Sequence, residues 1–329
     1  MKVLVVDHDS VVELLPMREC IAAMEEALVS LARGEADQPL RSIYRPSEVR
    51  GVMAMMPSFR GGDEPLFGLK AICVFPGNAA IGKDAHQGGV LLFSGETGEV
   101  LALVNASAIT AIRTAAVSGV ATRLLACVDA NELAIIGAGV QARSHMEAIA
   151  CVRSIKRARI AALHTEKTQA FAEEMQAKFD FPVEAARTPE DAVRGADLIV
   201  TATTAREPLV RREWISPGTH INAIGTFSPK AREIDTATIA AATLFVDRRE
   251  SALNEAGDYL IAAAEGTVRP DHIKAELGEV LVGRHPGRTS QDEITLFKSL
   301  GLGIEDLAAA AHVYHKAAEQ GAGTWIDFE

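Results

Sequence analysis

The segment that most constrains the fold of this chain is residues 135–142, which read IIGAGVQA. It follows an apolar run typical of a buried strand and opens a segment with helical spacing, so it has the G-x-G-x-x-A form of a dinucleotide-binding turn. In such a turn Gly137 allows the tight bend, Gly139 lets a pyrophosphate approach the backbone, and Ala142 permits close helix–strand packing. The N–H groups at the start of the helix would bind phosphate. We therefore expect cofactor contacts from Gly137, Gly139, Val140, Gln141 and Ala142, with a plain tight turn as the alternative.

The chain from about residue 130 onward alternates between short apolar runs and helical segments. Strands are expected at 133–136, 159–163, 197–201, 220–223 and 243–246, with helices at 142–151 and 169–179. Strands separated by helices indicate βαβ units. This part therefore predicts an α/β fold with a Rossmann-type, doubly wound parallel sheet.

The first third of the chain has a different pattern. Residues 17–32 have the apolar spacing of an amphipathic helix, and short β-like segments separated by Pro and Gly follow it. Residues 90–93 and 100–104 flank a turn (SGETGE) and predict a hairpin. An antiparallel sheet is therefore expected at about residues 40–105, followed by a nearly uncharged helix at 106–125. A last helix at 305–320 lies outside the βαβ pattern and is expected to pack on the first domain.

Composition and charge narrow the function classes. The chain has 329 residues, 48% hydrophobic and 23% charged, so it can bury a core and is not a disordered segment. Its net charge of −11 argues against nucleic acid and anionic membranes as partners. Four cysteines without metal-ligand spacing predict no metal site and fit a reducing cytoplasm. No uncharged apolar stretch approaches the ~20 residues of a membrane span.

The end of the second expected strand bears on the choice of cofactor. An acidic residue about 20 residues after the glycine turn would bind the ribose 2′-hydroxyl of NAD. Residues 161–167 read AALHTEK, so no acid stands at the strand end and Glu166 comes one or two residues late. His164, Thr165 and Lys167 could instead hold a 2′-phosphate. We therefore favour NADP(H) over NAD(H), with ordinary solvated loop residues as the alternative.

Three cations lie in apolar surroundings in the first third: Arg41, Lys70 and Arg113. Burying a cation without a partner is costly, so each needs either an internal acid or a bound anion. Few acids lie near them in sequence, and three cations together favour an anion site. The planar guanidinium fork suits a carboxylate. Burial beside other cations would lower the pKa of Lys70 and suit it to proton donation, and His86 is a second candidate for moving a proton.

The chain resembles the ornithine cyclodeaminase/mu-crystallin family over nearly its full length. The segments that carry the resemblance are 40–42 (LRS), 68–70 (GLK), 86–93 (HQGGVLLF), 110–116 (TAIRTAA), the glycine turn, 276–280 (ELGEV) and 296–301 (LFKSLG). The family implies a Rossmann domain, expected at 116–304, and an α+β substrate-binding and dimerisation domain, expected at 1–115 with 305–329. It also implies a homodimer and nicotinamide chemistry on small amino or imino acids.

The resemblance also assigns roles to residues. By position, Arg41, Lys70 and Arg113 match the residues that hold the substrate carboxylate. Further cofactor contacts are expected from residues that follow the Rossmann strands or open the domain: Thr114, Thr201, Thr203, Ile224 and Lys298.

Two departures from the cyclodeaminase pattern favour a subclass. Cyclodeaminases carry an Asp after the fourth Rossmann strand, where this chain has Phe227, and a carboxylate before a Met-Pro pair, where it has Ala54. Loss of both acids resembles ketimine reductases. We therefore expect NAD(P)H-dependent reduction of a cyclic ketimine, such as Δ1-pyrroline-2-carboxylate or Δ1-piperideine-2-carboxylate, with Phe227 beside the substrate ring and no acid among the three cations.

Two alternatives stay open. One is a cyclodeaminase or an amino-acid dehydrogenase, which would need a carboxylate from elsewhere, for example Glu64 or Asp84. The other is a non-catalytic protein that binds a nucleotide and a small ligand.

Overall fold

The computed structural model describes residues 1–328, which fold into two compact units. The first unit comprises Met1–Thr114 and the segment that begins at Gly301, and the second comprises Ala115–Leu300. The sequence-based division returns to the first unit only at residue 305. In the structure the chain re-enters the first unit four residues earlier, at Gly301. The final helix begins at Gly303, and the two residues before it already belong to the first unit.

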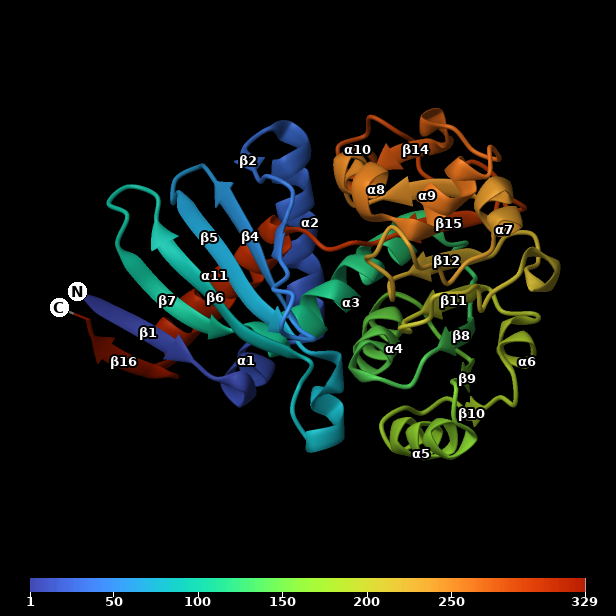
Figure 1. The fold of residues 1–329 in the computed structure, drawn as a ribbon, viewed down its shortest axis with the longest axis horizontal. Coiled ribbons are helices and arrows are strands. Elements are labelled where there is room, and N and C mark those ends of the chain that lie inside the picture. The colour runs from blue at the N-terminus through green and yellow to red at the C-terminus, as the bar shows by residue number, and fades with distance from the viewer. Residues whose placement is uncertain (329) are drawn as a thin grey trace. The chain divides into compact units, whose positions relative to one another are not determined.

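The first unit is built on a mostly antiparallel sheet (Figure 1). Its strand order is β16-β1-β7-β6-β5-β4-β2, with β3 paired to β4, and only the β1–β7 pair among its described pairings is parallel. The strands are β1 (Lys2–Val6), β2 (Ala36–Asp37), β3 (Ser42–Tyr44), β4 (Val52–Arg60), β5 (Leu66–Val74), β6 (His86–Ser94), β7 (Val100–Asn105) and β16 (Thr324–Asp327). The β6–β7 hairpin matches the expected one.

Helices cover one face of this sheet. They are α1 (His8–Leu14), α2 (Met17–Arg33) and α11 (Gly303–Gln320), with the 3-10 turn η1 (Pro76–Ile81) on the connection from β5 to β6. Helix α11 packs against β4, β5 and β6, as Figure 1 shows behind the strands. Gly68 makes this contact possible, because a Cβ there would lie 2.9 Å from the Cβ of Leu307. Alternate residues of β5 are therefore buried under α11, and Lys70 is one of them.

Helix α3 (Ala106–Leu125) has the bounds expected from the sequence and contributes residues to both units. Among the described residues it is the one helix whose length and composition would allow it to cross a bilayer. Its most apolar 18-residue window is 72% buried inside the protein. A core helix of this kind passes the same test, so the match is weak evidence for a membrane segment.

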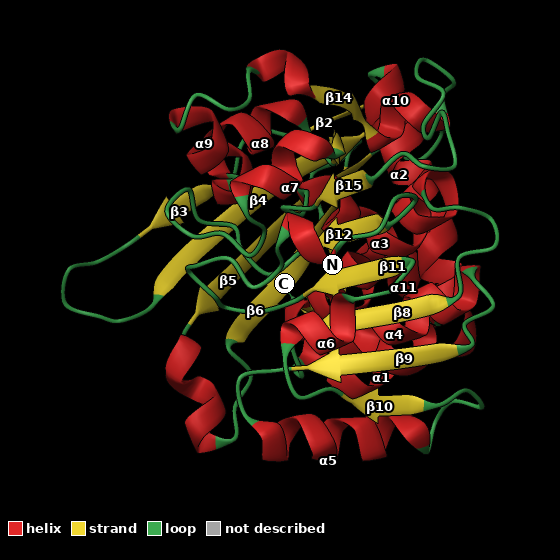
Figure 2. Cartoon of the chain, turned by 90° about the vertical axis from the view of Figure 1, so that its right-hand side faces the viewer, coloured by secondary structure: helices red, strands yellow, loops and turns green. Residues whose placement is uncertain are grey.

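The second unit is an all-parallel sheet with helices around it (Figure 2). Its order is β10-β9-β8-β11-β12-β15-β13-β14. The strands are β8 (Glu132–Ile136), β9 (Arg157–Ala161), β10 (Val183–Ala185), β11 (Leu198–Thr201), β12 (His220–Ala223), β13 (Thr243–Val246), β14 (Ile273–Glu276) and β15 (Thr295–Lys298). This confirms the α/β class and the doubly wound sheet, while β10, β14 and β15 were not among the expected strands.

The helices of the second unit connect these strands. They are α4 (Val140–Val152), α5 (Thr165–Gln176), α6 (Pro189–Val193), α7 (Thr236–Ala241), α8 (Arg249–Glu255), α9 (Gly257–Ala264) and α10 (Leu277–Leu281), with the 3-10 turns η2 (Arg212–Trp214) and η3 (Pro270–His272). Successive strand residues enter two separate hydrophobic clusters: Leu133 and Ile135 join one, Ala134 and Ile136 the other. The order in which successive strands are added to the sheet reverses at β8, because β9 and β10 lie on one side of it and β11 and β12 on the other. A ligand site is expected outside the carboxyl end of the strands at such a reversal.

Candidate active site

Gly137 directly follows β8 and has a conformation that only glycine adopts easily. Its φ is +126°, and a Cβ at this position would lie 2.5 Å from the carbonyl oxygen of Ala202. Its N–H donates to the carbonyl of Ala161 at 2.8 Å, which joins the turn to the end of β9. The glycine therefore brings the loops that follow β8 and β11 into backbone contact.

Gly139 serves a different purpose. It is the N-cap of α4, it is exposed, and nothing lies within 4 Å of the Cβ it lacks. Val140 beside it is exposed as well, while Ala142 is fully buried against the sheet. The turn thus leaves open space over the first N–H groups of a 13-residue helix. These features fit a diphosphate, because backbone N–H groups and the helix dipole both favour an anion there.

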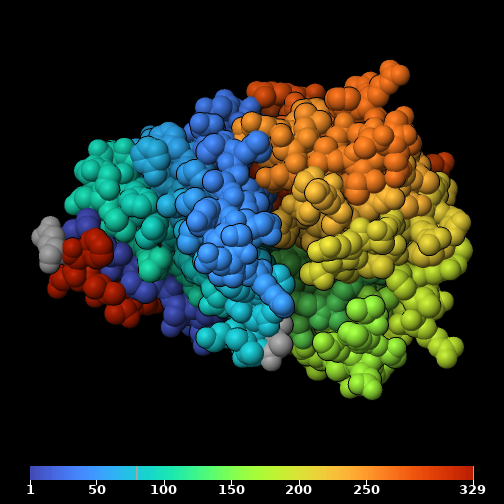
Figure 3. Space-filling model, in the orientation of Figure 1, coloured from blue at the N-terminus to red at the C-terminus, as the bar shows by residue number. Residues whose placement is uncertain are grey.

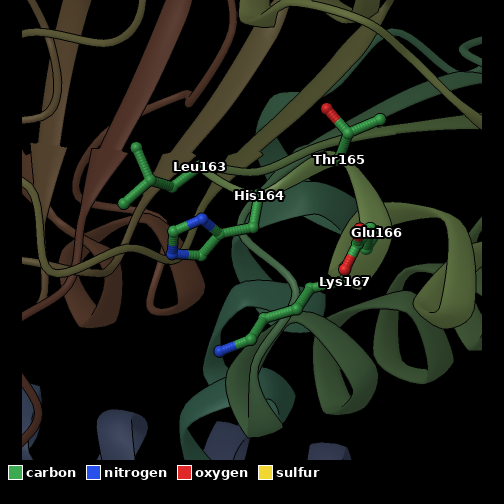
Figure 4. A pocket seen from close by; sticks show the side chains of 5 residues that line it. All are labelled: Leu163, His164, Thr165, Glu166 and Lys167. Atoms are coloured by element: carbon green, nitrogen blue, oxygen red, sulfur yellow. The ribbon is translucent and has the colours of Figure 1, made fainter.

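The segment after β9 forms an open hollow of about 560 Å³ lined by residues 163–167. The strand ends at Ala161, two residues before the expected end, so His164 becomes the N-cap of α5 and Thr165 its first residue. In Figure 4 the imidazole of His164 and the ammonium of Lys167 point in the same direction, away from Thr165. Glu166 is the only acid among the lining residues. The hollow therefore offers two nitrogen-bearing side chains at a helix N-terminus.

In the first unit, the structure brings the two buried cations of β5 and α3 onto one carboxylate. The ammonium of Lys70 lies 3.0 Å and 3.2 Å from the two carboxylate oxygens of Asp306. Arg113 donates through Nε to Asp306 at 2.9 Å and through Nη1 to Glu305 at 2.7 Å. These four side chains are at most 5% exposed. The cluster is therefore a buried ionic network between the sheet, α3 and α11.

Arg41 reaches the same network through Gly301. It opens the largely exposed segment before β4, which is medium blue on the surface in Figure 3. Its Nη2 donates to the carbonyl oxygen of Gly301 at 3.0 Å. A Cβ on Gly301 would lie 2.6 Å from Nη1 of Arg113, and the φ of this glycine is +80°. Gly301 therefore lets the guanidinium groups of Arg41 and Arg113 both approach its backbone. The three cations and the two carboxylates of the network together carry one net positive charge.

The network shifts the pKa values of its basic groups. Burial lowers the pKa of Lys70 to about 8, with Arg113 and Arg41 also lowering it and Asp306 opposing them. Burial likewise lowers the pKa of His86, and the charges of Lys70 and Arg113 lower it further. At neutral pH Lys70 is consequently charged, while His86 is neutral.

The expectation that no acid shares this site is wrong. Asp306 and Glu305 both contact the cations. They lie 193 and 192 residues from Arg113, so no pattern near the cations in the sequence pointed to them. A usable signal was present in α11, where two adjacent acids stand among buried alanines and leucines. Buried acids on an apolar helix need a cationic partner, just as the buried cations need an acidic one. The acids proposed as substitutes have other partners: Glu64 pairs with His315 at 3.1 Å, and Asp84 accepts from Ser107 at 2.8 Å.

The remaining predicted cofactor contacts have mixed positions. Thr114 is buried and donates to the carbonyl of Thr110 at 2.7 Å. Ile224 packs against the core, and Phe227 is 44% exposed in the loop after β12. Thr201 and Lys298 are fully buried: Thr201 donates to Glu233 at 2.9 Å, and Lys298 lies 3.0 Å from Asp258. The polar groups of Thr201 and Lys298 therefore bind acidic side chains within the second unit. Thr203 is less buried and also donates to Glu233, an acid that sequence reasoning missed.

Comparison with known proteins places the chain in a family. The family model described as "Ornithine cyclodeaminase/mu-crystallin family" matches residues 1–321. The chain belongs to this family. It is 39% identical over 326 residues to a Delta(1)-pyrroline-2-carboxylate reductase of Bacillus cereus, covering 99% of this chain and 100% of the relative.

Two solved structures are similar over the whole chain. The Thermococcus litoralis Delta(1)-pyrroline-2-carboxylate reductase in complex with NADH and L-proline is 40% identical, with a TM-score of 0.95 over 98% of this chain and 99% of that one. An archaeal alanine dehydrogenase dimer with bound NAD is 33% identical, with a TM-score of 0.93 over all of both chains.

Proposed function

We propose that this protein is an NAD(P)H-dependent oxidoreductase that reduces a cyclic ketimine, such as Δ1-pyrroline-2-carboxylate or Δ1-piperideine-2-carboxylate, to the cyclic amino acid. The observation that carries the proposal is the buried cation network of the first unit, in a chain 40% identical to a reductase solved with NADH and L-proline. Ala54 and Phe227 stand where cyclodeaminases carry acids, which further supports reduction over deamination.

The network binds the carboxylate of the substrate. Arg41, Lys70 and Arg113 supply one positive charge in excess of Asp306 and Glu305, so an anion completes the neutralisation. The two acids do not compete with the substrate in this account. They hold Lys70 and Arg113 in fixed orientations, and preorganised donors bind an anion with little reorganisation.

The second unit holds the cofactor through the glycine turn and the N-terminus of α4. When bound, a nicotinamide cofactor supplies the hydride for the C=N carbon. The protein supplies the proton on the imine nitrogen, and Lys70 suits this role better than His86 because it is charged at neutral pH. A hydride and a proton added across C=N give the amine, and Lys70 regains its proton from solvent.

NADP(H) is the proposed cofactor in preference to NAD(H). No acid ends β9, and His164 and Lys167 offer nitrogen groups to a 2′-phosphate in the hollow of Figure 4. Comparing the Kd of NADPH with that of NADH tests the preference. Lys167→Ala should weaken NADPH binding and leave NADH binding nearly unchanged, whereas equal losses for both would contradict it.

The proposed assembly is a homodimer formed through the uncovered face of the first sheet. Directly paired residues on this face are apolar: Phe67 on β5 pairs with Phe59 and Phe93, and Leu103 on β7 pairs with Leu91. Phe67 is 48% exposed and Leu103 39% exposed, which is unusual for aromatic and aliphatic residues in one patch. Light scattering of the purified protein should give the dimer mass, and Phe67→Asp should give the monomer.

We place the protein in the cytoplasm, which the four free cysteines support.

A direct assay tests the reaction. The protein is mixed with Δ1-pyrroline-2-carboxylate and NADPH, and the loss of reduced nicotinamide absorbance is compared with the formation of L-proline. Arg113→Ala serves as the matched variant: it should raise KM steeply and leave the cofactor Kd nearly unchanged. An unchanged KM would remove Arg113 from the substrate site.

A second function has one observation in its favour. Asp306 is a carboxylate beside Lys70, which is the kind of group that an amino-acid dehydrogenase or a cyclodeaminase would use. Release of ammonia from ornithine, or oxidation of alanine with NAD, in the absence of imine reduction would support this class. Tight cofactor binding without turnover of any of these substrates would indicate a non-catalytic binding protein.

A further inference from the structure

Glu233 is a fully buried acid in the segment between β12 and α7, outside the groups assigned to the reaction. Its carboxylate accepts four hydrogen bonds. The hydroxyl of Thr201 donates at 2.9 Å and the N–H of Gly225 at 2.7 Å, both to Oε2. The N–H and the hydroxyl of Thr203 each donate at 2.7 Å to Oε1. Both carboxylate oxygens are therefore occupied by donors from other segments.

These donors belong to the two segments that follow neighbouring strands. Thr201 ends β11 and Thr203 lies just after it, while Gly225 lies two residues after the end of β12. A Cβ on Gly225 would lie 2.2 Å from the carbonyl oxygen of Thr203 and 2.5 Å from Oε1 of Glu233. The two loops are thus pressed together with one carboxylate between them.

A second buried acid fixes Glu233 itself. Asp258 on α9 accepts the backbone N–H groups of Glu233 at 2.7 Å and Ile234 at 3.0 Å. It also accepts the hydroxyl of Thr226 at 3.0 Å. Lys298 at the end of β15 lies 3.0 Å from Asp258 and donates to the carbonyl of Thr226 at 2.7 Å. The loops after β11, β12 and β15 are therefore joined through two carboxylates and one ammonium.

The location of this network gives it a function beyond packing. The loops it joins leave the carboxyl ends of β11, β12 and β15, the end of the sheet that also carries the glycine turn after β8. Ligands of doubly wound sheets bind outside these carboxyl ends. We propose that Glu233 is a positioning residue, which holds the loops after β11 and β12 in the conformation that binds the nicotinamide half of the cofactor. This inference rests on the proposed binding of a nicotinamide cofactor by the second unit.

The chemistry of the site requires a carboxylate and not an amide. Four donors converge on two oxygens, and two of those donors are backbone N–H groups on different loops. Glutamine would keep the size of the side chain but replace one oxygen with an NH₂ group. In either orientation the NH₂ group would face the N–H of Thr203 or of Gly225, so one loop must move. An unmet buried donor is costly, which makes this displacement the expected response.

Glu233→Gln tests the inference, first in the absence of cofactor. Hydrogen exchange by mass spectrometry should show faster exchange at residues 202–205 and 224–228 than in the wild-type protein, with little change in the first unit. Fluorescence titration should then show that NADPH binds about tenfold more weakly or worse. The matched control is Glu265→Gln, which removes a carboxylate bonded to Thr236 and Arg232 at the surface of the same unit and should leave both readouts unchanged.

Several outcomes would overturn the inference. If Glu233→Gln lowers Tm but leaves the NADPH Kd unchanged, the network stabilises the fold without positioning the cofactor loops. If both exchange and Kd match those of Glu265→Gln, the network has no role in either. Should Glu233→Gln not fold, Thr203→Val removes one hydroxyl donor and leaves the other three bonds, and a wild-type Kd in that variant would count against the proposal.

The readouts separate this inference from the proposed reaction. Neither exchange nor NADPH titration requires an imino acid. Failure of the wild-type protein to reduce the cyclic imine would therefore refute the proposed substrate without touching the role of Glu233. Failure of the wild-type protein to bind either nicotinamide cofactor would refute the proposed function and the inference together.

Discussion

Replacing Asp306 with Asn should destabilise the first unit strongly. The side chain is 1% exposed and its carboxylate is the shared partner of Lys70 and Arg113. The substitution leaves two buried cations with Glu305 as the remaining carboxylate. Breaking a buried ion pair by removing one partner costs about 3–5 kcal/mol, since a desolvated charge loses its compensation. We therefore expect Asp306→Asn to lower the free energy of unfolding of this unit by at least about 3 kcal/mol.

The loss should depend on pH in a defined direction. The pKa of Lys70 is lowered from 10.5 to about 8 in the folded protein, mainly by burial, and Asp306 is the main group that raises it. Without Asp306 this pKa falls further. A base whose folded pKa lies below its unfolded value is penalised while it is charged, and the penalty is relieved as pH rises through the folded pKa. The difference in stability between wild type and variant should therefore shrink as the pH rises toward about 8, and stay constant above it because Lys70 is then uncharged in both folded proteins.

The two tryptophans allow the first unit to be observed alone. Trp325 lies on β16 in the first unit and Trp214 in η2 of the second. In a Trp214→Phe background, urea unfolding followed by fluorescence reports on the first unit. Glu64→Gln is the control, because it removes a surface partner of His315 in the same unit and should cost less than about 1 kcal/mol. A loss for Asp306→Asn no larger than that of the control would refute the buried-network account.

Three further predictions concern the two binding regions. Pyrrole-2-carboxylate, a substrate-like inhibitor, does not titrate near neutrality. Its Ki should be constant below about pH 8 and rise above that pH as Lys70 loses its proton. A Ki that stays constant up to pH 10 would exclude Lys70 from carboxylate binding. Gly301→Ala should raise the substrate KM at least about tenfold while the NADPH Kd stays constant, because its Cβ would displace Arg113, and the reverse pattern would contradict this. Gly137→Ala should weaken NADPH binding at least about tenfold and leave pyrrole-2-carboxylate binding unchanged, because a Cβ there meets the carbonyl of Ala202. An unchanged Kd for NADPH would contradict the role of the glycine turn in cofactor binding.

Local patterns in the sequence predicted the elements that local physics determines. Helix α3, β12 and β13 have the expected bounds because α3 is a long, nearly uncharged segment, and β12 and β13 are short segments without Lys, Arg, Asp or Glu. An edge strand such as β16 was missed because it lacks a buried apolar run. Strand β16 is exposed throughout and pairs with β1 across the whole chain, with Lys2 opposite Asp327. Pairing between distant segments leaves no periodic signal within either one.

The candidate site shows the same limit for charges. The sequence identified Arg41, Lys70 and Arg113 as unusual because cations stand out within apolar strands and helices. It could not pair them with Asp306 and Glu305, because the return of α11 onto β5 is a property of the tertiary fold. Glu233 was missed similarly, since its donors come from loops of ordinary composition.

The most direct test of the account follows the hydride itself. The protein is incubated with Δ1-pyrroline-2-carboxylate and NADPH carrying deuterium at the transferable position of C4, and the products are measured by mass spectrometry. The account predicts L-proline with one deuterium on Cα, formed in equal amount to NADP⁺. No proline, with the deuterated cofactor left intact, would contradict it, as would proline that carries no deuterium.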